Sequence, residues 1–429
     1  MSKGSKRPSR VIAAPGNAWS KTWFRQALFG VAAFLLWVIM MIGLRHIYPP
    51  NGDMVVLLRP WFAYIADHGF AGIATIRQNT GSDITPIWHF LMFLFTQTKF
   101  YNPQTVEYCV KSLAIFGTLI ATVAVFFIVK TLVKRPASWL PLVAAAVVPF
   151  LPAFFMDTVK ANIPDSIYLG LDLLALLALL KKRPGLAWFL VGVALSFKMM
   201  AIYILPFVVF LWLRKWPSAK VWHRVSPLFI IPGFLLTCIP GYLAGLSLYD
   251  STIGVLVFRA TTMGYEWWGI WQLLFNNSLL HVPGGIAADQ VHNVMLYGLA
   301  MLALIFIALF ALLFGIRDSQ RQNQAALDFL VASPILCYMF LPSQHEAYWA
   351  LSSVFALIVL VIRRSRASLA VLIVLSFTLF ELYLGGRVVS IIVLNYALLA
   401  VAGYLCFRIF QVSELRAKWR REPAPPIDL

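Results

Sequence analysis

Several carboxylates interrupt the long apolar runs of this sequence, and the first of them is Asp53. It follows Asn51-Gly52, a turn-forming pair, and precedes a stretch with helical hydrophobic spacing over residues 55–66. A carboxylate at such a position accepts hydrogen bonds from the free N–H groups of the helix start, and it can also take a proton from a substrate hydroxyl. Both roles stay open for Asp53.

A second pair of carboxylates, Asp157 and Asp165, brackets the polar segment "DTVKANIPDS". Pro164-Asp165-Ser166 is typical of a helix start, so Asp165 is expected at or near the cap. Two carboxylate loops on one face of a protein can divide the roles of base and of substrate orientation. If this segment faces the same side as Asp53, the sequence predicts one site with carboxylates from two loops.

Two further segments offer polar groups that suit a substrate site. Lys198, in "SFKMMAIYILPF", stands between two apolar runs, where its ammonium either extends to the lipid headgroups or binds a phosphate. The pair His345-Glu346 interrupts the apolar segment "FLPSQHEAYWAL" and is followed closely by Tyr348 and Trp349. Because residue 349 is Trp, the HExxH zinc motif is absent, and no other spacing in the chain compels a metal site.

The composition indicates which elements must carry these residues. The chain is 61% hydrophobic and 12% charged, with a mean hydropathy of +0.80, whereas soluble domains have about 25% charged residues. Apolar runs long enough to cross a bilayer recur from residue 27 to residue 410, and the first has no cleavage site typical of a signal peptide. We therefore expect an all-α, polytopic membrane protein with about 12 transmembrane helices.

The positions of the basic residues predict how the chain crosses the membrane. The tail 1–26 has six Lys and Arg residues and no acid, which places it in the cytoplasm. The apolar stretch 86–97 is too short to span the bilayer, so we expect an interfacial or re-entrant helix there, in the first outer loop. The later basic clusters then fall on the cytoplasmic side, as do both termini. The net charge of +18 is thus divided among loops, which argues against a nucleic-acid partner.

This threading places most acids and six of the seven histidines outside, so the active site is expected on the outer face of the cell membrane. The four cysteines lie in or beside apolar runs without a CxxC pair, which argues against disulfides and thiolate metal sites. The expected parts are a basic cytoplasmic tail, one transmembrane domain with three outer loops, and a second cytoplasmic tail. In chain order they are residues 1–26, residues 27–410 with the outer loops 49–105, 156–165 and 247–290, and residues 411–429.

Four parts of the chain, in order, resemble one family. They are "GDMVVLLRPWFAYIADHGF", "TPIWHFLMFLF", "PDSIYLGLDLL" with "SFKMMAIYILPF", and "LPSQHEAYWAL". These segments, spread over roughly residues 50–350, are similar to motifs of the bacterial relatives of GPI-anchor mannosyltransferases, which are GT-C glycosyltransferases. Where that family typically has WGQ before the second Asp, this chain has Ala161 to Pro164, and where it has HERY, Ala347 replaces the Arg. The missing Arg removes a possible phosphate fork, although related glucosyltransferases of N-glycan assembly also have the His-Glu pair without it.

The resemblance implies an inverting glycosyltransferase that moves a hexose (mannose, glucose or galactose) from a polyprenyl-phosphate donor to a glycan, glycolipid or cell-surface polymer. Asp53 would be the base, and Asp165 would orient the sugar or the acceptor. The donor phosphate and its sugar would be bound by Lys198, His345, Glu346, Arg259 and Tyr348. Because the chain has no dinucleotide fingerprint or P-loop, a lipid-linked donor is expected instead of a nucleotide sugar. No cofactor is expected, and a divalent metal stays open.

Two other classes of membrane protein remain as alternatives. A lipid-linked glycan polymerase or ligase usually presents arginines in its large outer loop, whereas the loop 247–290 has only Arg259. A lipid-linked sugar flippase or other carrier more often has ionisable residues at the middle of its spans. Only Asp172 lies well inside an expected span, and Lys198 and Asp328 lie near span ends. A transferase is therefore the first expectation, a polymerase or ligase the second and a carrier the third.

Overall fold

A computed structural model describes most of the chain. The described residues are 16–44, 54–82, 84–103, 106–133, 138–161, 164–252, 254, 269–271, 291–341, 349–384 and 388–413. Within these ranges every regular element is a helix, of the α, 3₁₀ or π kind, and there is no strand. The predicted all-α fold is confirmed.

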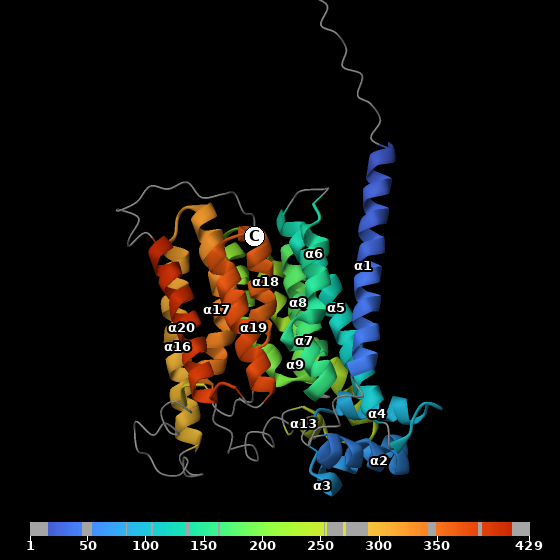
Figure 1. The fold of residues 1–429 in the computed structure, drawn as a ribbon. Helices are drawn as coiled ribbons and strands as arrows, with labels where there is room; N and C mark the ends of the chain where they lie inside the picture. Colours follow the sequence, from blue (N-terminus) through green and yellow to red (C-terminus); the bar gives the residue numbers. More distant parts are fainter. Residues whose placement is uncertain are drawn as a thin grey trace, which may run out of the picture.

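The first described part of the chain forms one long helix and a group of short ones. They are α1 (Gly16–Leu44), η1 (Met54–Leu58), α2 (Arg59–His68), η2 (Gly69–Ala71), α3 (Gly72–Thr80) and α4 (Pro86–Thr96). In Figure 1, α1 runs along the side of the bundle, and α2, α3 and α4 lie together beyond its lower end. We call this end of the molecule the α2–α4 end, and the opposite one the far end.

The middle of the chain supplies one side of the bundle. Its helices are α5 (Glu107–Val133), α6 (Leu140–Val147), η4 (Val148–Phe150), α7 (Pro152–Met156), η5 (Asp157–Ala161), α8 (Ser166–Leu180), α9 (Pro184–Phe197), η6 (Met199–Ile204), α10 (Leu205–Lys215), η7 (Trp216–Ser218), α11 (Val221–Arg224), η8 (Ser226–Phe229), α12 (Ile230–Leu243) and α13 (Leu248–Ser251). Short helices and turns divide many of these segments. Polar side chains near these breaks can leave the apolar core.

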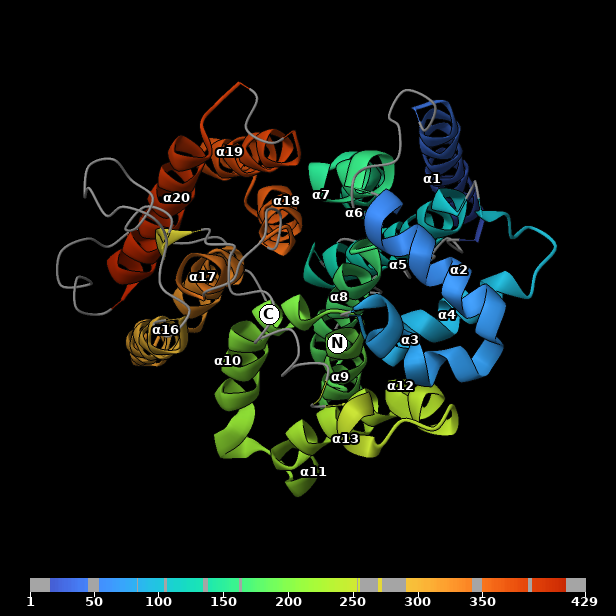
Figure 2. The same ribbon diagram turned by 90° about the horizontal axis from the view of Figure 1, so that it is seen from below.

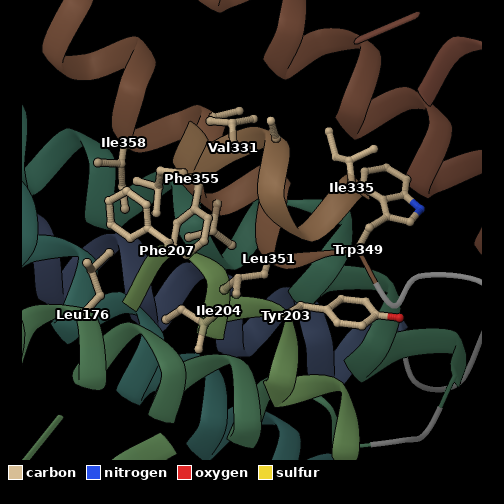
Figure 3. Packing of buried hydrophobic residues seen from close by; sticks show 14 of the residues in the cluster. Leu176, Tyr203, Ile204, Phe207, Val331, Ile335, Trp349, Leu351, Phe355 and Ile358 are labelled. Atoms are coloured by element: carbon tan, nitrogen blue, oxygen red, sulfur yellow. The ribbon is translucent and has the colours of Figure 1, made fainter. Parts of the chain in front are cut away.

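The last part of the chain supplies the other side of the bundle. Its described helices are α16 (Val291–Gly315), α17 (Ser319–Phe340), α18 (Leu351–Arg363), α19 (Arg366–Tyr383) and α20 (Ile391–Val412). Seen from the α2–α4 end in Figure 2, they lie together opposite α5, α8, α9 and α12. One apolar core joins the two sides, since Leu176 of α8, Phe207 of α10 and Phe355 of α18 meet in it (Figure 3).

Among the described residues, seven helices are long and apolar enough to cross a membrane. An eighth span results if the bent pair Leu140–Phe150 and Pro152–Val159, with 41° between its parts, crosses as one. These lengths and compositions indicate a membrane protein. The apolar helices α8, α9 and α18 are shorter, although each falls in a stretch expected to span. The number of twelve spans stays a prediction.

The short helix α4 has a clear start and a core of its own. Thr85 has an extended backbone, and Pro86 opens the helix at a position where the missing N–H costs nothing. The 11 residues of α4 extend about 17 Å, little more than half of a ~30 Å hydrocarbon layer. Met92 of α4 packs with Met54 and Trp61 in a separate apolar cluster of the α2–α4 end.

The helices α9 and α12 approach each other until their backbones touch. A Cβ added to Gly192 of α9 would lie 2.2 Å from the carbonyl oxygen of Ile230, and one added to Gly233 of α12 would lie 2.1 Å from that of Phe189. Small residues permit this close packing of membrane helices. Glycine at both positions therefore sets the spacing of α9 and α12.

Candidate functional site

An ion pair lies where α9 ends and α8 begins. The Lys198 Nζ atom lies 2.6 Å from each of the two carboxylate oxygens of Asp165. The Lys198 side chain is 13% exposed and that of Asp165 is 14% exposed, so the pair is largely enclosed but still reachable. Contact with both oxygens is charge-assisted and fixes the orientation of the carboxylate.

The backbone explains why Lys198 points to this place. α9 ends at Phe197, and Lys198 has an extended conformation (φ −155°, ψ 132°) before the 3₁₀ helix η6 starts at Met199. The side chain therefore leaves the helical path and its ammonium lies against Asp165. The two roles that the sequence left open for Lys198, contact with lipid headgroups and phosphate binding, both stay predictions.

The start of α8 is capped from a distance. Asp165 occupies the N-cap position, but its side chain makes no capping hydrogen bond. The Ser166 N–H instead donates to the Asp157 Oδ2 atom, at 3.0 Å. The predicted helix start after Pro164 is confirmed, but the capping role belongs to Asp157, because the Asp165 carboxylate faces Lys198.

The helix α5 holds the same turn of α8 from the side. The Ser166 hydroxyl donates to the carbonyl oxygen of Ala114, at 2.8 Å. A Cβ added to Gly117 would lie 2.4 Å from the backbone nitrogen of Ile167, so only glycine allows the two backbones to come this close. The first turn of α8 is thus fixed by α5 as well as by Asp157.

Aromatic side chains adjoin the ion pair. The Lys198 Nζ atom lies 5.9 Å from the centre of the Tyr168 ring, within the range of a cation–π interaction. Tyr168 is buried on α8, one turn after Asp165. Tyr203, five residues after Lys198 in the chain, is also fully buried. An apolar surround of this kind strengthens interactions between charges.

The helix α4 is attached to the chain next to Lys198. The Trp88 Nε1–H group donates to the carbonyl oxygen of Phe197, at 2.8 Å, and the two rings meet edge to face. On α12, a Cβ added to Gly241 would lie 2.8 Å from the Cβ atom of Pro86. The α2–α4 end is therefore fixed to the helix that presents the lysine.

His89 follows Trp88 and is buried in the α2–α4 end. Its Nε2 atom shares a hydrogen bond of 2.8 Å with the Ser82 hydroxyl, and its Nδ1 atom has no hydrogen-bond partner in the described part of the chain. Burial lowers the pKa of His89 to about 3, and the charge of Arg77 adds to the effect. His89 is therefore a neutral side chain at physiological pH.

The structure describes two of the seven predicted site residues, Asp165 and Lys198, and brings them together. The other five lie outside the described residues: Asp53, Arg259, His345, Glu346 and Tyr348. The roles proposed for these five and for the two residues of the ion pair stay predictions.

One residue of this site, Trp88, was not singled out from the sequence, and the capping contact of Asp157 was not predicted. Trp88 stands in "TPIWHFLMFLF", where an indole amid apolar residues was the available signal. The capping by Asp157 had no local signal, because the two partners are nine residues apart and no regular helix connects them. The available indication was the presence of two carboxylates, Asp157 and Asp165, on either side of one polar segment.

No group of three or more His, Cys, Asp or Glu side chains suited to a metal ion occurs among the described residues. Asp165 is instead balanced by Lys198, and Asp172, the carboxylate expected inside a span, is fully buried in α8. The described groups suit the recognition of phosphate and hydroxyl groups, since they combine an ammonium with a carboxylate.

Comparison with protein families gives one match in this region. Residues 64–214 match the MptA_B family, described as alpha-(1->6)-mannopyranosyltransferase, N-terminal domain. The match includes α4, Asp157, Asp165 and Lys198. It confirms the resemblance to GT-C-like mannosyltransferases that the sequence motifs indicated, and it supports glycosyltransferase activity. Comparison with curated proteins finds no match for the chain.

Proposed function

We propose that this glycosyltransferase, with its mannosyltransferase-family region at residues 64–214, transfers one hexose from a polyprenyl-phosphate donor to a hydroxyl of a glycan or glycolipid. We propose mannose as the sugar, because the matching family is described as a mannopyranosyltransferase. The observation that carries the proposal is the Asp165–Lys198 pair inside the matched region.

The proposed reaction is a single displacement with inversion at the anomeric carbon. The acceptor oxygen forms a bond to that carbon as the bond from the carbon to the phosphate oxygen breaks. The acceptor proton passes to the Asp53 carboxylate, and the lipid phosphate leaves with the bonding electron pair. A phosphate leaving group needs no general acid, but the charge that develops on it is stabilised by a fixed cation.

Lys198 is the proposed cation. Its ammonium is held at the start of α8 and is partly exposed, so a donor phosphate can share it with Asp165. The Asp165 carboxylate then has oxygen lone pairs for a hydroxyl of the sugar or of the acceptor. We assign the remaining contacts to the donor to Arg259, His345, Glu346 and Tyr348.

The packing of the α2–α4 end supports the role proposed for Asp53. Met54, the next residue in the chain, is fully buried and packs in the same cluster as Met92 of α4. Trp88 of the same helix is hydrogen-bonded to Phe197. The segment that follows Asp53 thus packs on α4. The same helix contacts Phe197, the residue directly before Lys198.

The distribution of charge supports an outward-facing site. Basic residues follow or end the helices at the far end, and cytoplasmic ends of membrane helices are enriched in Lys and Arg. These residues are Lys181, Lys182, Arg214, Lys215 and Arg363. We therefore propose that the α2–α4 end faces outward, that α2 to α4 lie at the membrane interface, and that about twelve spans leave both termini in the cytoplasm.

A transfer assay on the purified protein in lipid nanodiscs tests this function. The donors are polyprenyl-phosphate mannose, glucose and galactose, with GDP-mannose as a soluble control, and the acceptors are extracted envelope glycolipids. We expect the addition of a single mannose from the lipid donor and none from GDP-mannose. Addition of a whole glycan would identify a polymerase or ligase, and movement of the donor across the bilayer without a new glycosidic bond would identify a carrier.

A further inference from the structure

Asp157 is fully buried at the start of η5, where the chain has already bent away from the axis of α6. Its Oδ2 atom accepts the Ser166 N–H, whereas its Oδ1 atom has no hydrogen-bond partner in the described residues. A buried carboxylate oxygen without a partner costs free energy. A capping role alone therefore does not account for an aspartate at this position.

The Asp157 carboxylate is also close to the ion pair. It lies near enough to Asp165 and Lys198 for the charges of all three side chains to interact. The group that caps α8 is therefore part of the electrostatic environment of the ion pair.

The two aspartates have different partners at the start of α8. An aspartate at an N-cap position ordinarily accepts the N–H of the second or third helical residue. Asp165 stands at that position but makes no such bond, and both of its oxygens face the Lys198 ammonium. Asp157 accepts the N–H of Ser166, the first helical residue, which directly follows Asp165 in the chain.

We propose that Asp157 is a positioning residue for sugar transfer. By accepting the Ser166 N–H it fixes the backbone from which the Asp165 carboxylate reaches Lys198. Removal of the Asp157 side chain leaves the Ser166 N–H without this acceptor and loosens the first turn of α8, so Asp165 loses its fixed position and the ion pair opens. The inference rests on the proposed function only for the effect on transfer, since the effect on the ion pair is independent of it.

The test has a structural readout that does not need activity. Lys198 in the full-length protein is acetylated with an amine-reactive ester, and its modification is measured by mass spectrometry. We expect Asp157→Ala to raise the rate of modification of Lys198 severalfold, as does Asp165→Asn, which opens the pair directly. Asp157→Asn should behave like the native protein, because its amide oxygen still accepts the Ser166 N–H.

A matched control separates positioning from a general loss of helix capping. Asp318 caps α17 by accepting the Arg321 N–H at 2.7 Å, far along the chain from the ion pair. Asp318→Ala should lower the Tm, because it removes an exposed helix cap, and should leave the modification of Lys198 unchanged. Equal modification of Lys198 in the native protein and in folded Asp157→Ala would overturn the proposal.

Kinetics then connect the ion pair to transfer. We expect Asp157→Ala to lower kcat about 10–100-fold, the size of effect produced when a reacting group is misplaced by ~1 Å. In the Asp165→Asn background the same change should have little further effect, because the two residues act through one contact. Additive losses would contradict positioning. If Lys198 modification rises as expected but the native protein transfers no sugar, the positioning stands and the proposed function fails.

Discussion

Two groups of ion-paired side chains lie at opposite ends of the bundle, and they differ in where their residues sit on the helices and in how exposed these residues are. At the α2–α4 end, Asp165 and Lys198 come from the breaks that precede α8 and follow α9, and each is partly exposed. At the far end, Asp328 of α17 is bound by Arg363 of α18 and also contacts Arg408 of α20, with 3.4 Å between the Arg408 Nε and Asp328 Oδ2 atoms. The Asp328 side chain is only 1% exposed.

The difference indicates two purposes. The far-end cluster joins three helices through side chains that project from regular α-helical turns, and Arg363 also donates to the Gln324 carbonyl oxygen. The Asp328 and Arg363 side chains, 1% and 8% exposed, are closed to a substrate, and Arg408, 26% exposed, is the more open member. The pair at the α2–α4 end joins two helix ends and keeps an exposed face, as a site that exchanges ligands requires. The far-end cluster is therefore expected to matter for stability, and the other for transfer.

The largest effect on transfer is expected for Asp53→Asn. Asparagine caps a helix as well as aspartate, so the Tm should hardly change, but the amide cannot accept the proton. Transfer should fall by roughly 10²–10⁴-fold, the usual contribution of a general base. Measurement of Tm and turnover for Asp53→Asn and Asp53→Ala checks this. If Asp53 only caps a helix, the Asn variant is as active and stable as the native protein, and the Ala variant loses about 1 kcal/mol of stability. A fully active Asn variant would remove Asp53 from the mechanism.

The far-end cluster should show the opposite result. Asp328→Ala leaves the Arg363 guanidinium buried without its carboxylate, which is expected to cost about 3–5 kcal/mol of stability. Thermal unfolding in nanodiscs measures the loss. Turnover per folded molecule and the KM for the donor should stay unchanged. A change in donor KM without loss of stability would show that the comparison between the two ends is wrong.

A smaller effect is expected for Lys198→Ala. Loss of a charge-assisted contact with the donor phosphate is worth about 1.5–3 kcal/mol, which lowers kcat/KM for the donor by roughly 10–100-fold. The KM for the acceptor should change much less. Lys99→Ala, which removes an exposed lysine near the same end, is the control and should leave both constants unchanged. Unchanged donor kinetics in Lys198→Ala would leave the lysine with a structural role only.

The smallest expected effect concerns acid stability at the α2–α4 end. The pKa of His89 is lowered from 6.5 to about 3 in the folded protein, so the unfolded chain binds a proton first as the pH falls. The contribution of neutral His89 is therefore complete above pH 6.5 and is lost progressively between pH 6.5 and pH 3. His89→Gln should reduce the fall in Tm between pH 7.5 and pH 5. An identical fall in the variant would show that other groups control this transition.

The sequence predicted the parts of the fold that depend on local pattern. The short helix expected at residues 86–97 is α4 (Pro86–Thr96), and the helix start expected after Pro164 is the start of α8. Long apolar runs and Pro or Gly breaks are local properties, so they can be read from one stretch of chain. The number of spans does not follow from local pattern alone, because helices such as α8 and α9 are shorter than a bilayer requires.

The site depended on contacts that no local pattern contains. Asp165 and Lys198 were each predicted as site residues, but their direct pairing across 33 positions follows from how α8 and α9 pack. The capping of α8 by Asp157 likewise depends on the bend before η5. In both cases the sequence shows which groups are present, and tertiary packing decides which of them are neighbours.

The two attachments of α4 have a consequence for how a change on α12 is transmitted. Pro86 packs on Gly241 of α12, and Trp88 is hydrogen-bonded to Phe197 at the end of α9, while α9 and α12 touch through their glycines. A Cβ at position 241 would lie 2.8 Å from that of Pro86, so a side chain there pushes α4 away from α12 and strains the hydrogen bond between Trp88 and Phe197. A substitution on α12 would thus reach the residue before Lys198 without contact with the ion pair.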